Sequence, residues 1–147
     1  MILGIDPGKS GGFAVITETD AVVFAFDKMT PRDIVLTLKE YIPNITVAYI
    51  EQVSAFPGQG VCSVFTFGQN YGWWQGVLTA LGIPIERVSP LKWQTYMKCR
   101  TGGNKNVSKA RAQEIFPEKK ITHAIADALL IAEYGRRIRG NVNVEDL

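Results

Sequence analysis

Short apolar runs separated by turn residues characterise the first part of the chain. These runs predict strands, and they cover residues 1–6, 13–16, 21–26 and 45–51. The turn Pro7-Gly8-Lys9-Ser10-Gly11-Gly12 predicts that the first two strands form a hairpin. Thr30 and Pro31 predict a helix that ends near Tyr41, because they supply an N-cap residue and a proline at the first helical position.

Helices alternate with one further strand in the remaining sequence. Ser63 is the expected cap of a long helix that ends near Leu81. The elements expected after it are a strand at 83–88, a helix at 90–97, a basic loop at 98–106, a helix at 108–116 and a last helix from about 122 to just before 140. Hairpin strands followed by strands that alternate with helices predict an α/β fold with a mixed central sheet, antiparallel strands first and parallel strands afterwards, flanked by helices. The length of 147 residues predicts one domain, 1–147.

Two of the predicted strands end in an acidic residue. Asp6 ends the first strand and Glu51 ends the fourth. If these strands are parallel neighbours, both carboxylates emerge at the edge where open α/β sheets place their sites. The last helix adds His123 and Asp127, which share one helical face among mostly apolar neighbours. An acid in such surroundings is costly unless it is paired or bound to a metal.

Several carboxylates in one pocket repel one another, and either a proton or a divalent cation must relieve that repulsion. Oxygen ligands favour Mg²⁺, with Mn²⁺ as a substitute. Two such ions about 4 Å apart can activate a water and hold the scissile phosphate. The acids together therefore predict hydrolysis of a phosphodiester bond. Each acid alone is also compatible with a capped turn, a surface ion pair or a partner for a helix dipole.

The charge distribution adds a candidate for polyanion binding. The net charge is only +2, but one stretch contains basic residues with no acid between them: Arg87, Lys92, Lys98, Arg100, Lys105, Lys109 and Arg111. This stretch predicts binding to a nucleic acid, and a solvated loop and helix face is the alternative.

An uncharged segment extends from Gln52 to Ile85. Its content of glutamine, asparagine and glycine disfavours a membrane span, so we expect it to be buried or to face a partner. Glycines recur at 68, 72 and 76, a spacing that allows another backbone to approach closely. The domain's own sheet is slightly favoured as that neighbour over a second copy of the protein.

Cysteine usage and the N-terminal sequence predict a cytoplasmic protein. Cys62 and Cys99 have no spacing that suggests a zinc site or a disulfide framework, and no basic and apolar leader precedes the first strand.

The order of three motifs carries a family resemblance. GIDPGKSGG, then AYIEQV, then IADALLIAEYG closely resembles the RuvC-like Holliday junction resolvases, particularly the short phage-encoded members. The resemblance implies an RNase H-like fold, a homodimer, and paired magnesium-dependent nicks in a four-way DNA junction that leave 5′-phosphate and 3′-hydroxyl ends. The first motif alone also resembles the phosphate loop of actin-like ATPases, but the chain is too short for two such lobes.

The resemblance also assigns site residues. Asp6, Glu51 and Asp127 match the catalytic acids of the family, and His123 stands where many relatives have a fourth carboxylate. All four are the expected metal ligands. A neutral imidazole adds no negative charge, so the second ion is expected to bind more weakly and to depend on pH near 6 to 7. A histidine that binds no metal is the alternative.

Basic and aromatic residues complete the implied DNA-binding set. Lys109 is the expected catalytic lysine near the scissile phosphate. Phe56 matches an aromatic wedge that opens the junction, although it could instead cover a small core of its own loop. The expected DNA contacts are Lys9, Phe56, Lys92, Lys98, Arg100, Lys105 and Arg111.

The resemblance places the dimer interface on the Val64–Leu81 helix. Trp73 and Trp74 are adjacent and therefore point about 100° apart on a helix, so one of them is expected to face a partner. Burial of this helix within the monomer is the alternative.

The predicted function is a metal-dependent endonuclease that resolves four-way and other branched DNA. A broader RNase H-like nuclease that cuts RNA–DNA hybrids is one alternative, because the metal chemistry is shared. A catalytically weak junction-binding protein is another, because His123 replaces a carboxylate.

Overall fold

A five-stranded mixed sheet forms the centre of the structure, a computed structural model that describes residues 1–52 and 54–140. Its strands are β1 (Ile2–Asp6), β2 (Gly12–Ile16), β3 (Ala21–Ala25), β4 (Val47–Glu51) and β5 (Ile85–Val88). The order across the sheet is β3-β2-β1-β4-β5. The first three strands are antiparallel, whereas β4 is parallel to both β1 and β5. The predicted α/β class and mixed sheet are confirmed.

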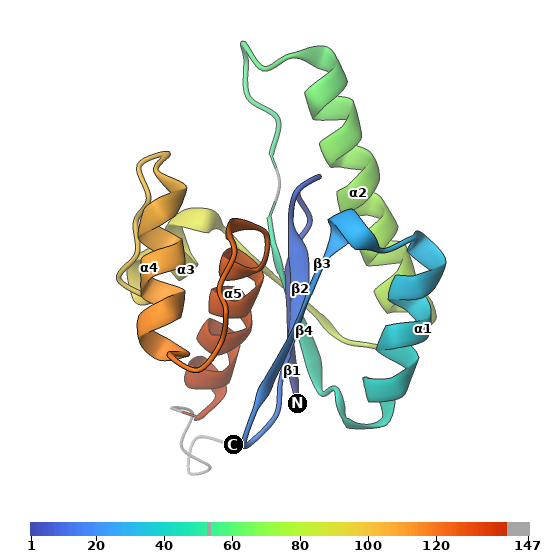
Figure 1. Cartoon of the computed structure of the whole chain (residues 1–147). Helices are drawn as coiled ribbons and strands as arrows, with labels where there is room; N and C mark the ends of the chain where they lie inside the picture. The colour runs from blue at the N-terminus through green and yellow to red at the C-terminus, as the bar shows by residue number, and fades with distance from the viewer. Residues whose placement is uncertain (53, 141–147) are drawn as a thin grey trace.

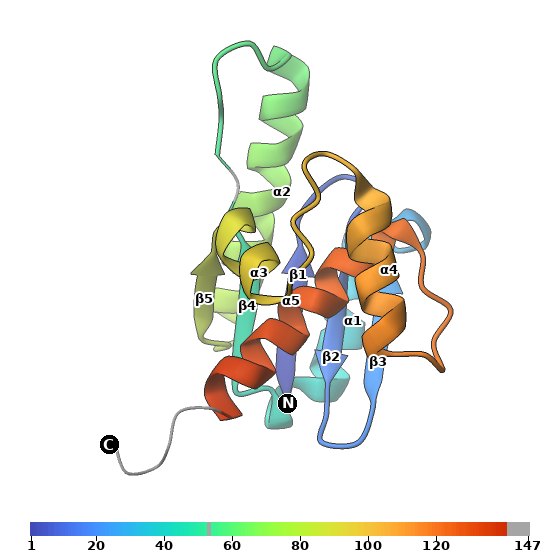
Figure 2. The ribbon, with the colours of Figure 1, turned by 90° about the vertical axis from the view of Figure 1, so that its left-hand side faces the viewer.

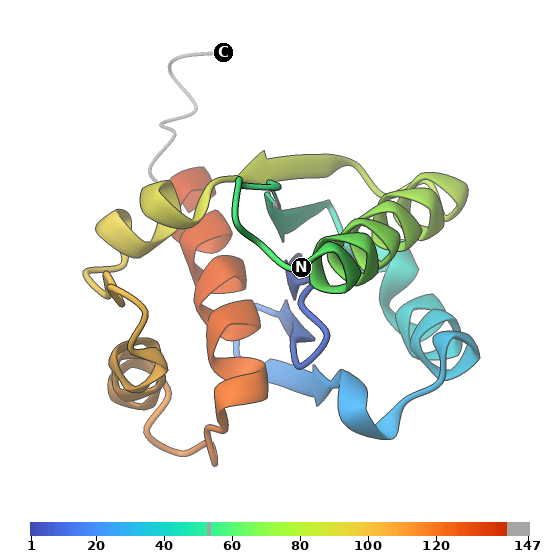
Figure 3. The same cartoon turned by 90° about the horizontal axis from the view of Figure 1, so that it is seen from above.

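Helices cover both faces of this sheet (Figure 1). One face carries α1 (Pro31–Tyr41) and α2 (Val61–Ala80), and the other carries α3 (Pro90–Tyr96), α4 (Lys105–Ile115) and α5 (His123–Gly140), with α5 lying directly on the sheet (Figure 3). Two short 3-10 helices, Phe26–Lys28 and Ile42–Asn44, flank α1. Each face of the sheet has its own apolar core. The predicted span of 1–147 includes residues 53 and 141–147, which lie outside the described ones.

Helix starts follow capping chemistry, and two of them differ from the predictions. Thr30 forms the predicted cap of α1 and exchanges hydrogen bonds with Asp33 in a capping box. Helix α2 begins after Gly60 instead of at Ser63, because the Gly60 carbonyl already accepts from Val64 N at 3.0 Å. Helix α4 begins at Lys105 instead of Ser108, because the Asn104 side chain caps it by accepting from the Asn106 N–H.

Helix α2 extends beyond the sheet (Figures 1 and 2). Most of its side chains are exposed or half-buried. The expectation that its glycine stripe packs on the sheet is wrong, because Cβ atoms added at 68, 72 or 76 would meet nothing within 4 Å. The stripe lies on the side of the helix that points away from the core. Trp74 is buried on the sheet side, and Trp73 is half-buried with its ring 5.2 Å from that of Trp74.

Helix α5 makes its closest approach to the sheet at Gly4 of β1. A Cβ atom added at Gly4 would collide with the backbone N of Ala132 and the carbonyl O of Ala128. Gly135 allows a similar approach to the ring of Tyr49 on β4. Small residues on the strand and on the helix therefore let α5 lie against β1 and β4. This contact sets how far the α5 backbone lies from the sheet.

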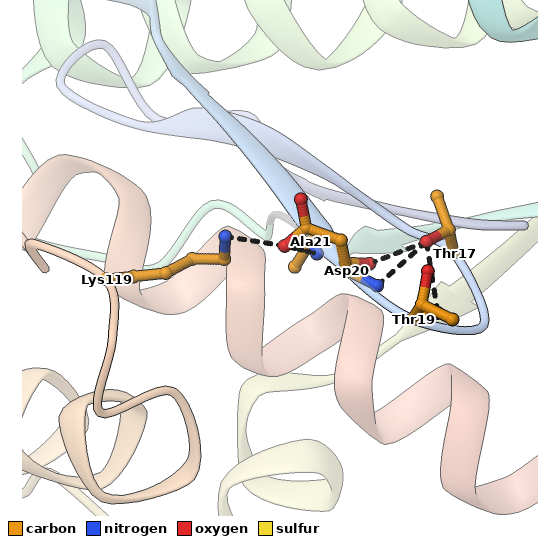
Figure 4. A network of polar contacts seen from close by, with 5 residues as sticks. All are labelled: Thr17, Thr19, Asp20, Ala21 and Lys119. Atoms are coloured by element: carbon orange, nitrogen blue, oxygen red, sulfur yellow. Dashed lines mark hydrogen bonds and ion pairs between the residues drawn. The ribbon is translucent and has the colours of Figure 1, made fainter.

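A polar network ties the β2–β3 turn to the segment before α5 (Figure 4). Asp20 Oδ1 accepts from Lys119 Nζ at 2.8 Å and from the backbone N of Ala21 at 2.7 Å. Thr17 Oγ1 accepts from the backbone N of Asp20 and donates to its carbonyl O. The hydrogen bond from Lys119 lowers the pKa of the exposed Asp20 carboxyl. The network joins two connections that lie far apart in the sequence.

No helix in the described ranges, 1–52 and 54–140, is both long and apolar enough to cross a membrane.

Gly4→Ala should destabilise the protein, because the added methyl group has no space between β1 and α5. We expect a loss of about 1–3 kcal/mol in the free energy of unfolding, measured by urea denaturation. Gly140→Ala, at the last residue of α5, is the control, since its Cβ also enters open space. It should leave the stability unchanged or raise it by about 0.5–1 kcal/mol through helix propensity. Equal effects of the two substitutions would contradict the close approach at Gly4.

Candidate active site

The first two candidate acids leave the sheet side by side. Strands β1 and β4 are parallel neighbours, with Ile5 paired to Ile50, and Asp6 and Glu51 are the next residue on each strand. Because successive residues of paired parallel strands stay in register, both carboxylates lie at the same edge. The predicted meeting of these two strand ends is confirmed.

The third acid reaches the same pocket from the opposite end of the sequence. Asp127 is on the second turn of α5, one residue before the Ala128 carbonyl that contacts Gly4. Asp6, Glu51 and Asp127 together line a pocket of about 340 Å³. The other lining residues include Lys9, Gly11, Phe67, Gln94, Thr101 and Lys105. Side chains from β1, β4 and α5 thus share one pocket.

The glycine-rich turn after β1 wraps around Asp6. The Gly8 N–H donates to Asp6 Oδ1 at 3.0 Å, and the Gly11 N–H donates to the Gly8 carbonyl at 2.9 Å. A Cβ atom at Gly11 would collide with the backbone carbonyl of Asp6 and come within 3.0 Å of its Oδ2. Only glycine at this position allows the turn to close over the Asp6 side chain.

Burial raises the pKa values of all three carboxyls, and repulsion by a neighbouring carboxylate adds to the rise at Asp6 and Glu51. Burial raises the pKa of Asp6 to about 6, against the Gly8 hydrogen bond, and the Asp127 charge adds to the rise. Burial, followed by the Asp6 charge, raises the pKa of Glu51 to about 8. Burial also raises the pKa of Asp127. The neighbouring hydrogen-bond donors and positive charges therefore do not fully offset the negative charge of the three carboxylates.

Three other side chains act on these carboxylates. Trp93, on α3, donates its indole N–H to Glu51 Oε1 at 3.3 Å. The buried side chain of Ser108, on α4, lowers the pKa of Asp127, and its hydroxyl donates to the Lys105 carbonyl at 3.2 Å. Lys105, at the start of α4, lines the pocket, and its charge lowers the pKa of all three acids.

Trp93 and Ser108 are site residues that the sequence does not predict. No local pattern marks Trp93, since its partner lies 42 residues away. The sequence predicts a helix start at Ser108, whereas this residue lies inside α4, where its buried side chain lowers the pKa of Asp127.

The predicted fourth ligand lies outside the pocket lining. His123 is exposed in the first turn of α5, and its electrostatic effect on Asp127 is the smallest of those that lower the pKa of that acid. Lys109 is half-buried on α4 and does not line the pocket, whereas Lys105, one turn earlier, does. The catalytic roles of His123 and Lys109 stay predictions.

Of the predicted DNA contacts, Lys9 and Lys105 line the carboxylate pocket. Phe56 is 65% exposed in the loop before α2, so it does not bury itself in a core of that loop. Arg111 donates to the Met97 carbonyl at 2.9 Å and forms an ion pair with Glu114 at 2.8 Å, so its guanidinium group already has partners. The exposed basic residues of the set are Lys9, Lys92, Lys98, Arg100 and Lys105.

The three carboxylates fit a divalent cation in charge and in ligand type. Their oxygen atoms suit Mg²⁺ or Mn²⁺, and Oδ1 of Asp127 is buried with no hydrogen-bond partner among the described residues. Across the part of the chain that the structure describes, no three His, Cys, Asp or Glu side chains are grouped closely enough to hold one ion. The three carboxylates nevertheless line one pocket.

Solved structures of two other proteins have a fold similar to that of this chain. No family model and no curated protein sequence matches the chain. RuvC of Thermus thermophilus superposes with a TM-score of 0.59 at 15% identity, over 94% of this chain and 96% of RuvC. The same protein in complex with a Holliday junction substrate gives 0.59 at 15% identity, over 93% and 94% of the two chains. Fowlpox virus resolvase, in complex with Holliday junction DNA, gives 0.55 at 15% identity, over 94% of this chain and 99% of that one.

These structures define the class of fold first. The chain has an RNase H-like fold, with a mixed five-stranded sheet flanked by helices. Within that class its architecture is similar to those of RuvC and Fowlpox virus resolvase, over nearly the whole length of the chain. At 15% identity the likeness concerns the fold.

The raised carboxyl pKa values predict how stability depends on pH without divalent cations. Between pH 4.5 and 8 the folded protein retains a proton on Glu51 that the unfolded chain has released, so stability falls as the pH rises through this range. Glu51→Gln removes this penalty. Its free energy of unfolding should exceed that of the wild type by on the order of 1–3 kcal/mol at pH 9 and match it at pH 4.

Urea denaturation at several pH values measures this difference, and Glu40→Gln, at an exposed acid of α1, is the control. Parallel stability curves for the wild type and Glu51→Gln from pH 5 to 9 would contradict the burial of Glu51 and its repulsion by neighbouring carboxylates. Magnesium at pH 9 should stabilise the wild type more than Glu51→Gln.

Proposed function

We propose that this chain is a metal-dependent endonuclease that cuts four-way and other branched DNA junctions by paired nicks. The observation that carries the proposal is the shared pocket of Asp6, Glu51 and Asp127, built by β1, β4 and α5. The fold supports it, because two of the similar structures are complexes with Holliday junction DNA. We further propose that residues 1–147 act as one domain in the cytoplasm.

The carboxylates are the proposed ligands of two Mg²⁺ ions, for which Mn²⁺ can substitute, with His123 as a fourth ligand. Bound ions of this kind polarise the phosphate and lower the pKa of a water molecule. The protein's own contribution is to keep uncompensated carboxylate charge in a pocket, where it attracts a cation. Glu51 and Asp6, at adjacent strand ends, set the spacing of this charge on a rigid part of the sheet.

Basic residues at the rim are proposed to hold the DNA strand. Lys9 and Lys105 line the carboxylate pocket from distant parts of the sequence, one in the turn after β1 and one at the start of α4. Their charges favour a phosphate close to the acids, in spite of the negative charge of the acids. Lys92, Lys98 and Arg100 extend the exposed positive charge along the α3–α4 segment. Phe56 remains the proposed wedge.

The protein is proposed to act as a homodimer through the Val64–Leu81 part of α2. This helix has no charged residue, and its glycine stripe faces open space. Close approach of a second copy of the helix would cover that surface. A dimer also fits two nicks placed symmetrically in a four-way junction.

A nicking assay tests the proposal. A labelled synthetic four-way junction is incubated with Mg²⁺ or Mn²⁺, with linear duplex and an RNA–DNA hybrid as competing substrates. We expect preferential cleavage of the junction, and a loss of at least about 100-fold in rate for Glu51→Gln, equivalent to about 3 kcal/mol of transition-state stabilisation.

The other outcomes separate the alternatives. Equal rates for the wild type and Glu51→Gln would exclude the proposed site. Preferential cleavage of the hybrid would identify a broader RNase H-like nuclease. Junction binding without any nicking, in either metal, would identify a junction-binding protein.

Two lysines on one helix provide a second test. Lys105→Ala should lower the nicking rate at saturating junction more than Lys109→Ala does, because only Lys105 lines the carboxylate pocket. Each substitution should also make junction binding less dependent on salt, by a slope of about 1 for each phosphate that the protein no longer neutralises. A greater fall in rate for Lys109→Ala would instead place Lys109 beside the scissile phosphate, as the family resemblance implies.

A further inference from the structure

Trp93 occupies a rigid position beside the carboxylate pocket. It lies in the middle of α3, which begins at the Ser89 cap immediately after β5. Its side chain is completely buried, in the same apolar core as Met97 and Cys99. The Gln52 N–H donates to the Val88 carbonyl at 2.8 Å, so the chain after Glu51 is tied to the residue that precedes Ser89. The indole ring and the Glu51 backbone are therefore fixed relative to each other.

The indole N–H is the only polar group of this side chain, and Glu51 accepts its hydrogen bond. The distance from Trp93 Nε1 to Glu51 Oε1 is 3.3 Å. An apolar core requires no N–H group, and a buried N–H without a partner would be costly. The hydrogen bond thus gives the N–H of a core tryptophan a partner, and that partner is one of the three pocket acids.

The chemistry of the donor matters because Glu51 is under repulsion from Asp6 and Asp127. A lysine or arginine in place of the indole would also hold the carboxylate, but it would neutralise the charge and compete with a cation. The indole is neutral and donates a single hydrogen bond. It holds Oε1 and leaves the negative charge of Glu51, and the acceptor capacity of Oε2, for another partner.

We infer that Trp93 is a positioning residue for Glu51, which holds this carboxylate in the orientation that a divalent cation in the pocket requires. The inference rests on the proposed function for the identity of the cation. It adds a residue of α3 to the proposed site. Partners that orient metal ligands from outside the coordination shell typically change metal affinity or activity by about 10–100-fold. Trp93 acts through Glu51 and does not itself contact the DNA or the ion.

Trp93→Phe tests the inference, because phenylalanine keeps an aromatic ring in the core and removes the N–H. Trp74→Phe is the matched control, since Trp74 is also buried but lies in the core on the other face of the sheet. Titration calorimetry with Mn²⁺ alone, without DNA, measures cation affinity. We expect it to fall by about 10-fold or more in Trp93→Phe and to stay unchanged in Trp74→Phe. Thermal unfolding of both variants reports on their folding.

Two readouts separate positioning from a merely structural role. In ¹H–¹⁵N spectra, addition of Mg²⁺, which is diamagnetic, should shift the indole resonance of Trp93 and leave those of Trp73 and Trp74 in place. In a Glu51→Gln background, Trp93→Phe should cause no further decrease in Mn²⁺ affinity, because both changes remove the same interaction.

In junction cleavage by the wild type and Trp93→Phe, the rate at saturating junction should fall with an unchanged KM, and higher Mg²⁺ should restore part of it. An unchanged Mn²⁺ affinity in a folded Trp93→Phe, or equal decreases in Trp93→Phe and Trp74→Phe, would overturn the inference. A wild type that fails to nick any junction, while Trp93→Phe still lowers Mn²⁺ affinity, would overturn the proposed function and support the positioning role. The two failures are therefore distinguishable.

Discussion

The backbone-to-backbone contact between α5 and β1 is the constraint on which the carboxylate pocket depends. Gly4 has no side chain, and Ala128 and Ala132 have only methyl groups, so the helix axis lies unusually close to the strand. Asp127 precedes Ala128 by one residue, and Asp6 follows Gly4 by two. The contact that packs the helix thus also sets the distance between two of the acids. A larger residue at the crossing would lift α5 and separate its carboxylate from the strand ends.

The charge balance of the pocket follows from this packing. Three acids are brought together by apolar contacts beneath them. Burial raises the pKa values of all three, and repulsion raises those of Asp6 and Glu51 further. Trp93, a neutral donor from α3, holds Glu51 without cancelling its charge, and Ser108 of α4 lowers the pKa of Asp127. Lys105 is the cation of the same segment that lines the pocket. The α3–α4 segment therefore contributes orientation and a limited amount of positive charge, and it leaves room for an additional cation.

Much of the fold can be predicted from local patterns, and the failures have physical causes. Strand ends at Asp6 and Glu51 are predictable, because apolar runs and turn glycines determine where strands stop. The neighbour that the glycine stripe of α2 faces is not predictable, because the same spacing fits packing on a sheet or on a second helix. The starts of α2 and α4 differ from prediction, since several residues in each segment could act as caps. The Trp93–Glu51 contact links segments 42 residues apart, and only the tertiary structure reveals it.

The location of Asp127 on the last helix has a consequence for synthesis of the protein. Strands β1 and β4, with Asp6 and Glu51, lie in the first part of the chain, whereas α5 is the last of the described elements. A ribosome releases these strands well before the helix that brings the third acid. The partly made chain has two carboxylates at an uncovered sheet face and no pocket between them. The chain can therefore acquire its complete set of acids only after α5 has left the ribosome, so a nascent chain that lacks this helix has no complete site.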